Sequence, residues 1–195
     1  MPFCAIDMLD LIYQLDEVPF VGRRQAGNEI VPVVERSGIV TGKTSRRNCH
    51  IGGTKLLHPV VHLHIVNRDG EMFLQRRSEF KDIHPLKWDM AVGGHVGYGE
   101  MLPEALVRES SEEIGLRDFN PVQIYDYVYE SDMERELVAV YATVGNFSIT
   151  PDSLEVIDGC YWTVNQIDDS LGRDIFTPVF ETEYRALKDK ILSLL

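Results

Sequence analysis

The sequence predicts an α/β domain in which a few helices pack on a mixed sheet. Short apolar stretches separated by turn signals indicate several strands, and a few segments with helical spacing interrupt them. The chain has 195 residues, a length that suits one compact domain with a short extension, and 44% of them are hydrophobic, which is enough for a packed core. We therefore expect a domain over residues 29–195, preceded by a helical extension and linker over residues 1–28.

Two turn signals help to place the strands. Ser37-Gly38 and Asp69-Gly70 each stand between apolar stretches, as the turns of β-hairpins do. The sequence GGHVGYG, residues 93–99, is expected to form a glycine-rich loop. The strands expected in chain order cover residues 30–34, 39–43, 59–67, 71–75, 89–92, 121–129, 135–144 and 158–163.

Helical spacing of apolar residues occurs in three segments, residues 1–17, 102–114 and 180–195. The middle segment has an apolar stripe and ends at Gly115, a residue typical of helix C-termini. The first segment predicts a short amphipathic helix, which either packs on the domain or pairs with another subunit in a homodimer.

Acidic residues outnumber basic ones by 31 to 19, which gives a formal net charge of −12. Tight binding to nucleic acid or to an anionic membrane needs a basic surface, so the composition argues against both partners. The three cysteines are an odd number without the spacing of a zinc site, which favours a reducing compartment. The sequence contains neither a signal-peptide pattern nor an apolar run of transmembrane length, so we expect a soluble, cytoplasmic protein.

The middle helix carries the pattern with the clearest chemistry. Glu109, Glu112 and Glu113 stand at i, i+3 and i+4, so their side chains share one helix face, with Cβ atoms about 5–6 Å apart. Like charges at this spacing repel one another unless something neutralises them, and Mg²⁺ prefers carboxylate oxygen ligands. Arg108 can hold one of these carboxylates, or Glu100, in a fixed rotamer. The alternative is a solvated acidic helix end that binds no metal.

Residues 94–116 resemble the signature of the Nudix hydrolases. That signature reads glycine, five residues, glutamate, seven residues, Arg-Glu, an aliphatic residue, any residue, Glu-Glu, any residue, glycine and an aliphatic residue. Only Ser110 departs from it, at a position where the family has a bulky aliphatic residue. The corresponding positions of this chain are Gly94, Glu100, Arg108, Glu109, Ser110, Glu112, Glu113, Gly115 and Leu116.

Resemblance to this family implies an α/β/α sandwich with a mixed sheet, in which the signature forms a loop–helix–loop that binds Mg²⁺ or Mn²⁺. It also implies hydrolysis of a small-molecule diphosphate, such as a nucleoside diphosphate derivative. On this basis Arg108 and Glu100 are expected to support the metal site. The expected metal ligands are Glu109, Glu112, Glu113 and a backbone carbonyl near Gly94.

Hydrolysis of a diphosphate needs an activated water and positive groups next to the phosphate oxygens. The general base is expected to be Glu112 or a glutamate from another loop, for which the candidates are Glu134, Glu136 and Glu155. The expected substrate-binding cations lie at the end of a predicted strand and just after it, and they are Arg76, Arg77 and Lys81. The alternative for these three is that they are ordinary surface cations.

Residues 56–96 are similar to one Nudix subgroup, which contains isopentenyl-diphosphate isomerase and its hydrolase-like relatives. The sequence Phe-Thr-Pro at residues 176–178 is also similar to that group. The isomerase binds a metal through three histidines and two glutamates, which implies a second metal site in this chain. Each similar residue, taken alone, is also compatible with an ordinary polar position. These residues are His50, His58, His95, Glu134 and Glu136.

The resemblance leaves a hydrolase and an isomerase as alternatives. The isomerase protonates an alkene with a cysteine just before the Gly-His pair of the loop, where this chain has Gly93. General acid catalysis requires a positioned donor, and the sequence offers no evident one. Because the Arg-Glu and Glu-Glu pairs of the hydrolases are complete, we expect a hydrolase, with an isomerase-like enzyme as the alternative. A non-catalytic binding module, the third alternative, has no evident need for these carboxylates.

Overall fold

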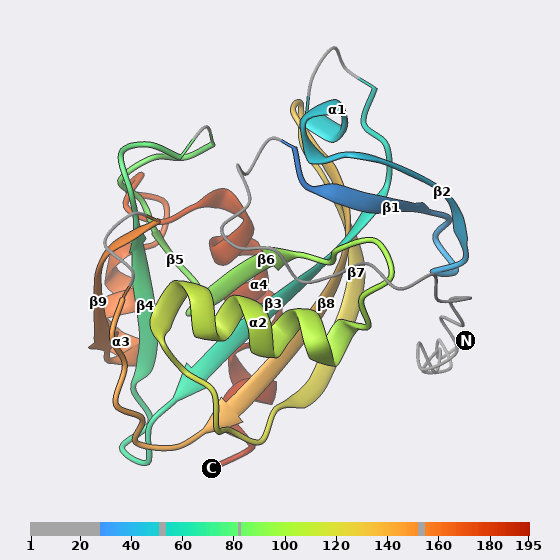
Figure 1. The fold of residues 1–195 in the computed structure, drawn as a ribbon. Coiled ribbons are helices and arrows are strands. Elements are labelled where there is room, and N and C mark those ends of the chain that lie inside the picture. The colour runs from blue at the N-terminus through green and yellow to red at the C-terminus, as the bar shows by residue number, and fades with distance from the viewer. Residues whose placement is uncertain (1–27, 51–53, 82, 152–154) are drawn as a thin grey trace, which may run out of the picture. The chain divides into compact units, whose positions relative to one another are not determined.

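The computed structural model describes residues 28–50, 54–81, 83–151 and 155–195 (Figure 1). The helix expected over residues 1–17, and with it any homodimer contact, lies outside these residues. The chain divides into two compact units, and the predicted domain boundary after residue 28 stays a prediction. As far as they are described, residues 28–60, 95–105 and 127–138 form the first unit, and residues 61–94, 106–126 and 139–195 form the second.

The first unit contains a two-stranded antiparallel sheet of β1 (Ile30–Val34) and β2 (Val40–Ser45). This sheet is the hairpin that the Ser37-Gly38 turn signal predicts. The short helix α1 (Arg46–His50) follows β2 directly. A small apolar core supports the unit, and its buried members are Val34, Leu57 and Leu137.

A seven-stranded sheet contains the other strands, which are β3 (His58–Val66), β4 (Met72–Arg77), β5 (Trp88–Asp89), β6 (Val92–His95), β7 (Val122–Glu130), β8 (Arg135–Val144) and β9 (Val156–Trp162). Its order is β5-β4-β3-β8-β7, with β6 paired to β3 and β9 paired to β4 (Figure 1). β3 is buried at every position, as a strand in the middle of a covered sheet must be. This burial includes three histidines, which therefore need polar partners inside the protein.

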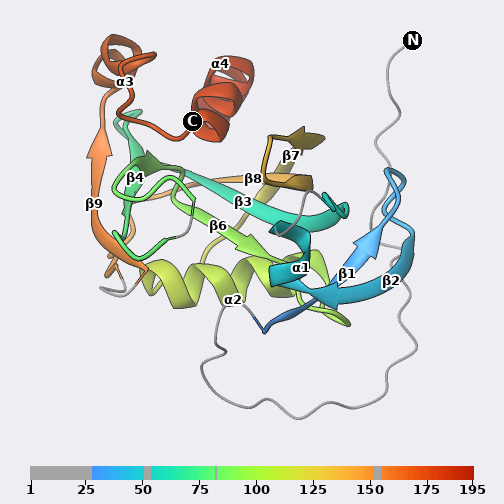
Figure 2. The ribbon, with the colours of Figure 1, turned by 90° about the horizontal axis from the view of Figure 1, so that it is seen from above.

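Three further helices accompany the sheet, and they are α2 (Leu102–Ile114), α3 (Val164–Ser170) and α4 (Pro178–Leu192). In the second unit, α2 lies on one face of the sheet, and α3 and α4 lie on the other face (Figure 2). These layers are those of the α/β/α sandwich that the resemblance to the Nudix hydrolases implies. No helix in the described part of the chain is long and apolar enough to cross a membrane.

The predicted bounds of α2 are confirmed. Its apolar stripe is buried, and the left-handed φ of 69° at Gly115 ends the helix. The last helix, expected over residues 180–195, runs instead from Pro178 to Leu192. It begins earlier because Thr177 caps it, accepting a hydrogen bond from the Phe180 N–H at 3.2 Å.

Two other expectations are wrong. The single strand expected over residues 89–92 is in fact two strands, β5 and β6. Gly93, Gly94 and His95, expected in a loop, lie in β6 because this segment pairs with β3. The sequence also does not predict α1 and α3, which have only five and seven residues, too few for a clear helical period. α3 is stabilised instead by a capping box at Thr163.

Candidate functional site

Arg108 joins two glutamates of α2. Its Nη1 atom lies 2.8 Å from Glu109 Oε1 and 3.3 Å from Glu112 Oε2. The pairing expected from the sequence is therefore confirmed, and one guanidinium group holds both carboxylates on the same side of the helix. Glu112 is exposed and Glu109 is half-buried, so the two carboxylates lie between the surface of the second unit and its interior.

Glu109 also lies against the backbone of Gly94 in β6. A Cβ atom at Gly94 would overlap the Glu109 side chain, so no residue other than glycine fits this position without a shift. Glycine is needed here for a close approach of backbone and carboxylate, not for a turn. The structure thus brings together Gly94 and Glu109, two of the metal ligands predicted from the sequence.

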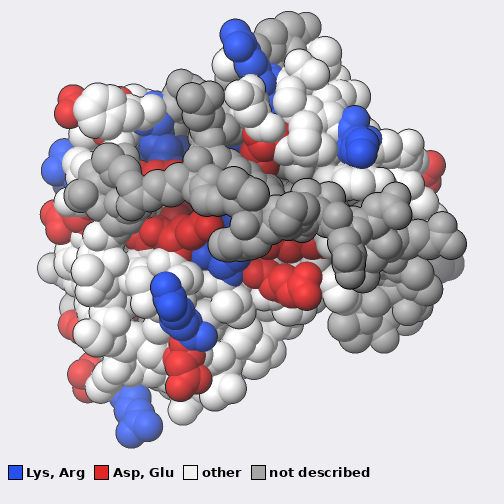
Figure 3. Space-filling view, in the orientation of Figure 1, with Lys and Arg blue, Asp and Glu red and all other residues white. Residues whose placement is uncertain are grey.

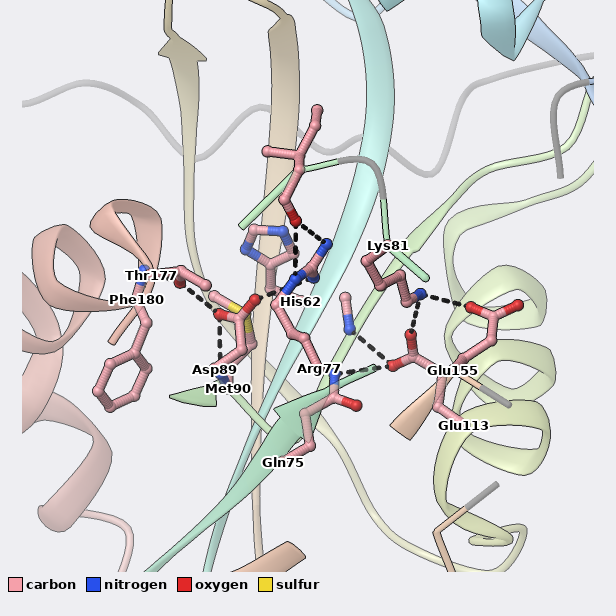
Figure 4. Close-up of polar contacts among 12 residues, drawn as sticks. His62, Gln75, Arg77, Lys81, Asp89, Met90, Glu113, Glu155, Thr177 and Phe180 are labelled. Carbon is pink, nitrogen blue, oxygen red and sulfur yellow. Dashed lines mark hydrogen bonds and ion pairs between the residues drawn. The ribbon is translucent and has the colours of Figure 1, made fainter. Parts of the chain in front are cut away.

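Glu113 is almost completely buried, with 3% of its surface exposed. Its Oε2 atom accepts hydrogen bonds from the Gly93 N–H and from Gln75 Nε2, both at 3.1 Å (Figure 4). Burial raises the pKa of Glu113, and the nearby Lys81 ammonium group and the Gly93 N–H partly oppose this rise. Two donors on one oxygen fix the orientation of the carboxylate.

Lys81 connects Glu113 with a second carboxylate. Its Nζ atom lies 3.8 Å from Glu113 Oε1 and 2.5 Å from Glu155 Oε2 (Figure 4). Glu155, just before β9, is therefore linked to the end of α2 through this lysine. The other two candidate bases outside the helix, Glu134 and Glu136, belong to the first unit.

Arg77 and Arg76 form hydrogen bonds with the protein itself. Arg77 donates to Asp89 Oδ2 at 3.2 Å and to the Ile83 carbonyl at 3.0 and 3.2 Å (Figure 4). Arg76 Nε donates to a backbone carbonyl of the same segment at 3.2 Å. These bonds fix the connection between β4 and β5, in which Lys81 lies. Substrate binding by the three cations stays a prediction.

Glu100 and Ser110 are two further positions of the signature. Glu100, in the first unit, accepts a hydrogen bond from the Gly97 N–H at 2.8 Å and closes the turn before α2. Ser110 is completely buried, and its hydroxyl group has no hydrogen bond to any described residue. The departure from the signature therefore places a polar group where burial without a partner is costly.

Three histidines meet in the first unit, although they come from α1, β3 and β6. The ring of His50 lies 5.5 Å from the rings of His58 and His95, which stack on each other at 5.1 Å. One nitrogen from each ring lies within 4.8 Å of the others. His58 is completely buried, yet no described residue forms a hydrogen bond with its Nε2 atom. A cation between the rings would satisfy that atom.

Two glutamates lie beside these rings. Glu134 Oε2 is 3.3 Å from His50 Nδ1, and Glu136 Oε1 is 3.8 Å from His58 Nε2 and 4.0 Å from His95 Nε2. Burial lowers the pKa of His58 to about 4, which keeps its ring neutral, as a metal ligand must be. The structure thus brings together all five residues of the predicted second site. Imidazole and carboxylate donors together suit Mn²⁺ or Zn²⁺.

A buried polar cluster between β3 and α4 is not predicted from the sequence. Glu183 accepts hydrogen bonds from His62 Nδ1 at 2.6 Å and from His64 Nε2 at 2.8 Å. The alternation of the two histidines places them on one strand face, which the sequence does indicate. Their partner lies 121 residues beyond His62, so no local pattern identifies it. The hydrogen bond from Gln75 to Glu113 joins residues 38 positions apart, so no local pattern identifies this contact either.

The face drawn in Figure 3 carries separate basic side chains among acidic ones. The described residues form no broad basic area on this face. Where basic side chains stand singly like this, a bound phosphate group depends on individual cations and on metal ions.

Comparison with known proteins identifies the family behind these features. The family profile described as NUDIX domain matches residues 56–180, which is more than half of the chain. The chain belongs to the Nudix hydrolases. Members of this family are pyrophosphohydrolases, and they generally use divalent metals. The predicted family, and its α/β fold with a mixed sheet, are therefore confirmed.

Individual relatives agree with this assignment. The Nudix hydrolase YfcD of Escherichia coli K12 is 30% identical over 158 residues, which cover 80% of this chain and 84% of that protein. A Nudix hydrolase of Streptomyces coelicolor is 28% identical over 169 residues, or 86% of this chain and 92% of that protein. The crystal structure of a MutT protein from Methanosarcina mazei matches with a TM-score of 0.59 and 25% identity, covering 70% of this chain and 96% of that one.

A Deinococcus radiodurans crystal structure resembles the fold over a larger share of the chain. It matches with a TM-score of 0.69 and covers 84% of this chain and 99% of its own. At 19% identity, this likeness supports the fold alone.

Proposed function

We propose that the chain is a Mg²⁺- or Mn²⁺-dependent hydrolase that cleaves the diphosphate linkage of a nucleoside diphosphate derivative or a related small organic diphosphate. The observation that carries this proposal is the environment of Glu113. This carboxylate is buried, and Gly93 and Gln75 hold one of its oxygens while the other faces the Lys81 cation. A carboxylate at this depth is stable only when it is hydrogen-bonded and opposite a positive charge.

The proposed metal ligands are Glu109, Glu112, Glu113 and the Gly94 carbonyl. All of them offer oxygen, which hard divalent cations prefer, and Gly94 approaches Glu109 closely. A bound Mg²⁺ would neutralise phosphate charge and lower the pKa of an attacking water. Arg108 orients Glu109 and Glu112, and Glu100 is proposed to support the site from the turn before α2.

The proposed general base is Glu112 or Glu155. Glu112 is exposed on the helix, and Lys81 holds Glu155 close to the same carboxylates. Glu155 is preferred over Glu134 and Glu136, because those two lie beside the histidines of the first unit. Lys81 is also the preferred phosphate contact, because it already lies next to a proposed metal ligand, whereas Arg77 is held by Asp89 and Arg76 by a backbone carbonyl.

The test is hydrolysis of a panel of nucleoside diphosphates, nucleotide sugars and isoprenoid diphosphates, with and without Mg²⁺. Phosphorus NMR follows loss of the P–O–P linkage, which we expect with Mg²⁺ and not without it. Glu113→Gln should abolish the reaction, whereas Glu104→Gln on the same helix should leave it unchanged. Folded protein that cleaves none of these compounds with Mg²⁺ or Mn²⁺ contradicts the proposal.

The isomerase-like subgroup is the alternative, and the cluster of three histidines and two glutamates favours it. That cluster is proposed as a second metal site, made of His50, His58, His95, Glu134 and Glu136. Gly93 leaves the chain without the cysteine that the isomerase uses, so we propose hydrolysis as the main activity. Conversion of isopentenyl diphosphate to its dimethylallyl isomer, absent in Glu136→Gln, would instead establish the isomerase.

A small diphosphate is the proposed partner, in a cytoplasmic protein, because the cysteine pattern favours a reducing compartment. A homodimer through the apolar stripe of residues 1–17 is tested by sedimentation of the full chain.

A further inference from the structure

We propose that Gln75 determines which divalent cations bind at Glu113, because it leaves only one oxygen of that carboxylate available to a metal. The inference rests on the proposed function, because Glu113 is there a metal ligand. It goes further by concerning the choice between Mg²⁺ and the larger Ca²⁺. Both cations bind carboxylate oxygens, but Ca²⁺ readily accepts both oxygens of one carboxylate, whereas Mg²⁺ demands near-octahedral geometry.

Gln75 points at Glu113 from a strand whose backbone is fixed on both sides. Asp89 of β5 and Gly159 of β9 both pair with it. Its side chain is only 2% exposed, and the three residues before it in β4 are buried and apolar. Its Nε2 atom donates to Glu113 Oε2 at 3.1 Å (Figure 4). This donor is therefore held in place by the sheet itself.

The two oxygens of Glu113 differ in what surrounds them. An ionised carboxylate offers about two lone-pair sites on each oxygen. Oε2 accepts from both the Gly93 N–H and Gln75, so its two sites are used. Oε1 lies 3.8 Å from Lys81 Nζ, which is an ion pair longer than a hydrogen bond. Among the described residues, only Oε1 is thus left with sites for a cation.

The amide group of Gln75 is satisfied on one side only. Its Oε1 atom is buried, and no described residue forms a hydrogen bond with it. A buried polar atom without a partner costs stability, so stability alone favours an apolar side chain at this position. A residue that breaks this rule is expected where it serves a site. What the glutamine adds here is its bond to Glu113.

Loss of this bond would change the coordination that Glu113 offers. Without the Gln75 donor, one lone-pair site of Oε2 opens, and both oxygens can face the same cation. That arrangement suits Ca²⁺, whereas Mg²⁺ binds less tightly to a carboxylate that has lost its orientation. Groups that orient a metal ligand typically affect metal affinity by about 10- to 100-fold. Gln75 should therefore favour Mg²⁺ over Ca²⁺.

Asn67 provides a matched control. It is a second buried amide of the same unit, 7% exposed, and its Nδ2 atom donates to Glu71 Oε2 at 2.8 Å. Its Oδ1 atom accepts from the N–H groups of Asp69 and Glu71, so this amide stabilises the turn between β3 and β4. Asn67→Leu should lower the melting temperature and leave cation binding unchanged.

The experiment is calorimetric titration of the full-length chain with Mg²⁺ and, separately, with Ca²⁺, which both prefer carboxylate oxygens over imidazoles. Glu113→Gln measures the binding that belongs to other sites. We expect the ratio of the Kd for Ca²⁺ to the Kd for Mg²⁺ to fall about tenfold in Gln75→Met. In Asn67→Leu this ratio should equal that of the wild type. Gln75→Leu takes the place of Gln75→Met if that variant does not fold.

An unchanged ratio in the Gln75 variant would overturn the inference and leave the proposed function intact. The same fall in Asn67→Leu would also overturn it, because the effect would then be general destabilisation. A folded wild-type chain that binds Mg²⁺ no more tightly than Glu113→Gln would overturn the proposed function and this inference together.

Discussion

The Gly93 N–H donates to Glu113 Oε2 at 3.1 Å, so a strand of the sheet holds a carboxylate of the signature helix from the side. The next residue, Gly94, lies against Glu109 of the same helix. Two consecutive glycines of β6 therefore determine where two glutamates of α2 lie.

The two glycines should respond differently to an added methyl group. Gly94→Ala places a Cβ atom inside the Glu109 side chain, so we expect Mg²⁺ affinity and kcat/KM to fall by about 100-fold. Gly93→Ala makes only ordinary contacts and should stay near wild type. Calorimetry and steady-state kinetics on the two variants compare them directly, and equal effects would contradict this account.

Arg108→Met should affect function more than stability. Arg108 is partly exposed, so its ion pairs with Glu109 and Glu112 contribute only about 0–1 kcal/mol to folding. Without it the two carboxylates repel each other and lose their common orientation, so we expect Mg²⁺ to bind about tenfold more weakly. Urea unfolding and metal titration measure the two effects. Arg117→Met, which removes an exposed hydrogen bond to Ser111, is the control and should change neither.

His58→Gln should remove a metal ion from the first unit. The buried ring offers a nitrogen to the cluster, and its loss removes the ring on which His95 stacks and which His50 meets edge-on. We expect protein purified with Mn²⁺ or Zn²⁺ to lose this metal, as measured by elemental analysis. His84→Gln, in the second unit, should retain it. The same metal content in both variants would argue against the second site.

Glu183→Gln should change how stability depends on pH. Because the folded pKa of Glu183 lies below the ordinary value of 4.5, its stabilising effect is complete above that pH and is lost as the pH falls further. At pH 7 we expect the variant to be less stable by roughly 1–3 kcal/mol. Below pH 4.5 the two melting temperatures should converge. Parallel curves over this range would mean that Glu183 is not ionised in the folded protein.

Thr177→Ala should destabilise the start of α4. The Thr177 hydroxyl accepts from the Phe180 N–H and donates to Asp89 Oδ1 at 2.7 Å, in a buried position. Loss of an N-cap costs about 1–2 kcal/mol, which urea unfolding resolves. Thr182→Ala, on the exposed side of the same helix, should cost little. A smaller effect at Thr177 than at Thr182 would contradict the capping role.

The sequence predicts α2 and its acidic face well because both depend on local spacing. The apolar stripe, Gly115 and the positions of Glu109, Glu112 and Glu113 follow from the geometry of a single helix. The histidine cluster was expected only through resemblance, since His50, His58 and His95 come from separate elements. Spacing alone would not have indicated it.

The contacts that the sequence does not predict are tertiary. Glu155 reaches Lys81, and Glu183 reaches His62, only after the sheet and the helices on its two faces have formed. Similarly, Gly93 and Gly94 look like loop residues until β6 pairs with β3. Glycine alone indicates conformational freedom, and it does not distinguish a turn from a strand that must approach another backbone or side chain.

Asp89 accepts hydrogen bonds from Arg77, at the end of β4, and from Thr177, the cap of α4. Thr177 follows Asp89 by 88 residues. During synthesis the ribosome adds Thr177 several seconds after Asp89, at a rate of about 5–20 residues per second. Over that interval Asp89 lacks its hydrogen bond from Thr177. Asp89 also accepts from Arg77, which fixes the connection between β4 and β5 in which Lys81 lies. A nascent chain that stalls before Thr177 would therefore expose an incomplete site, and the complete network forms only when the last helix docks.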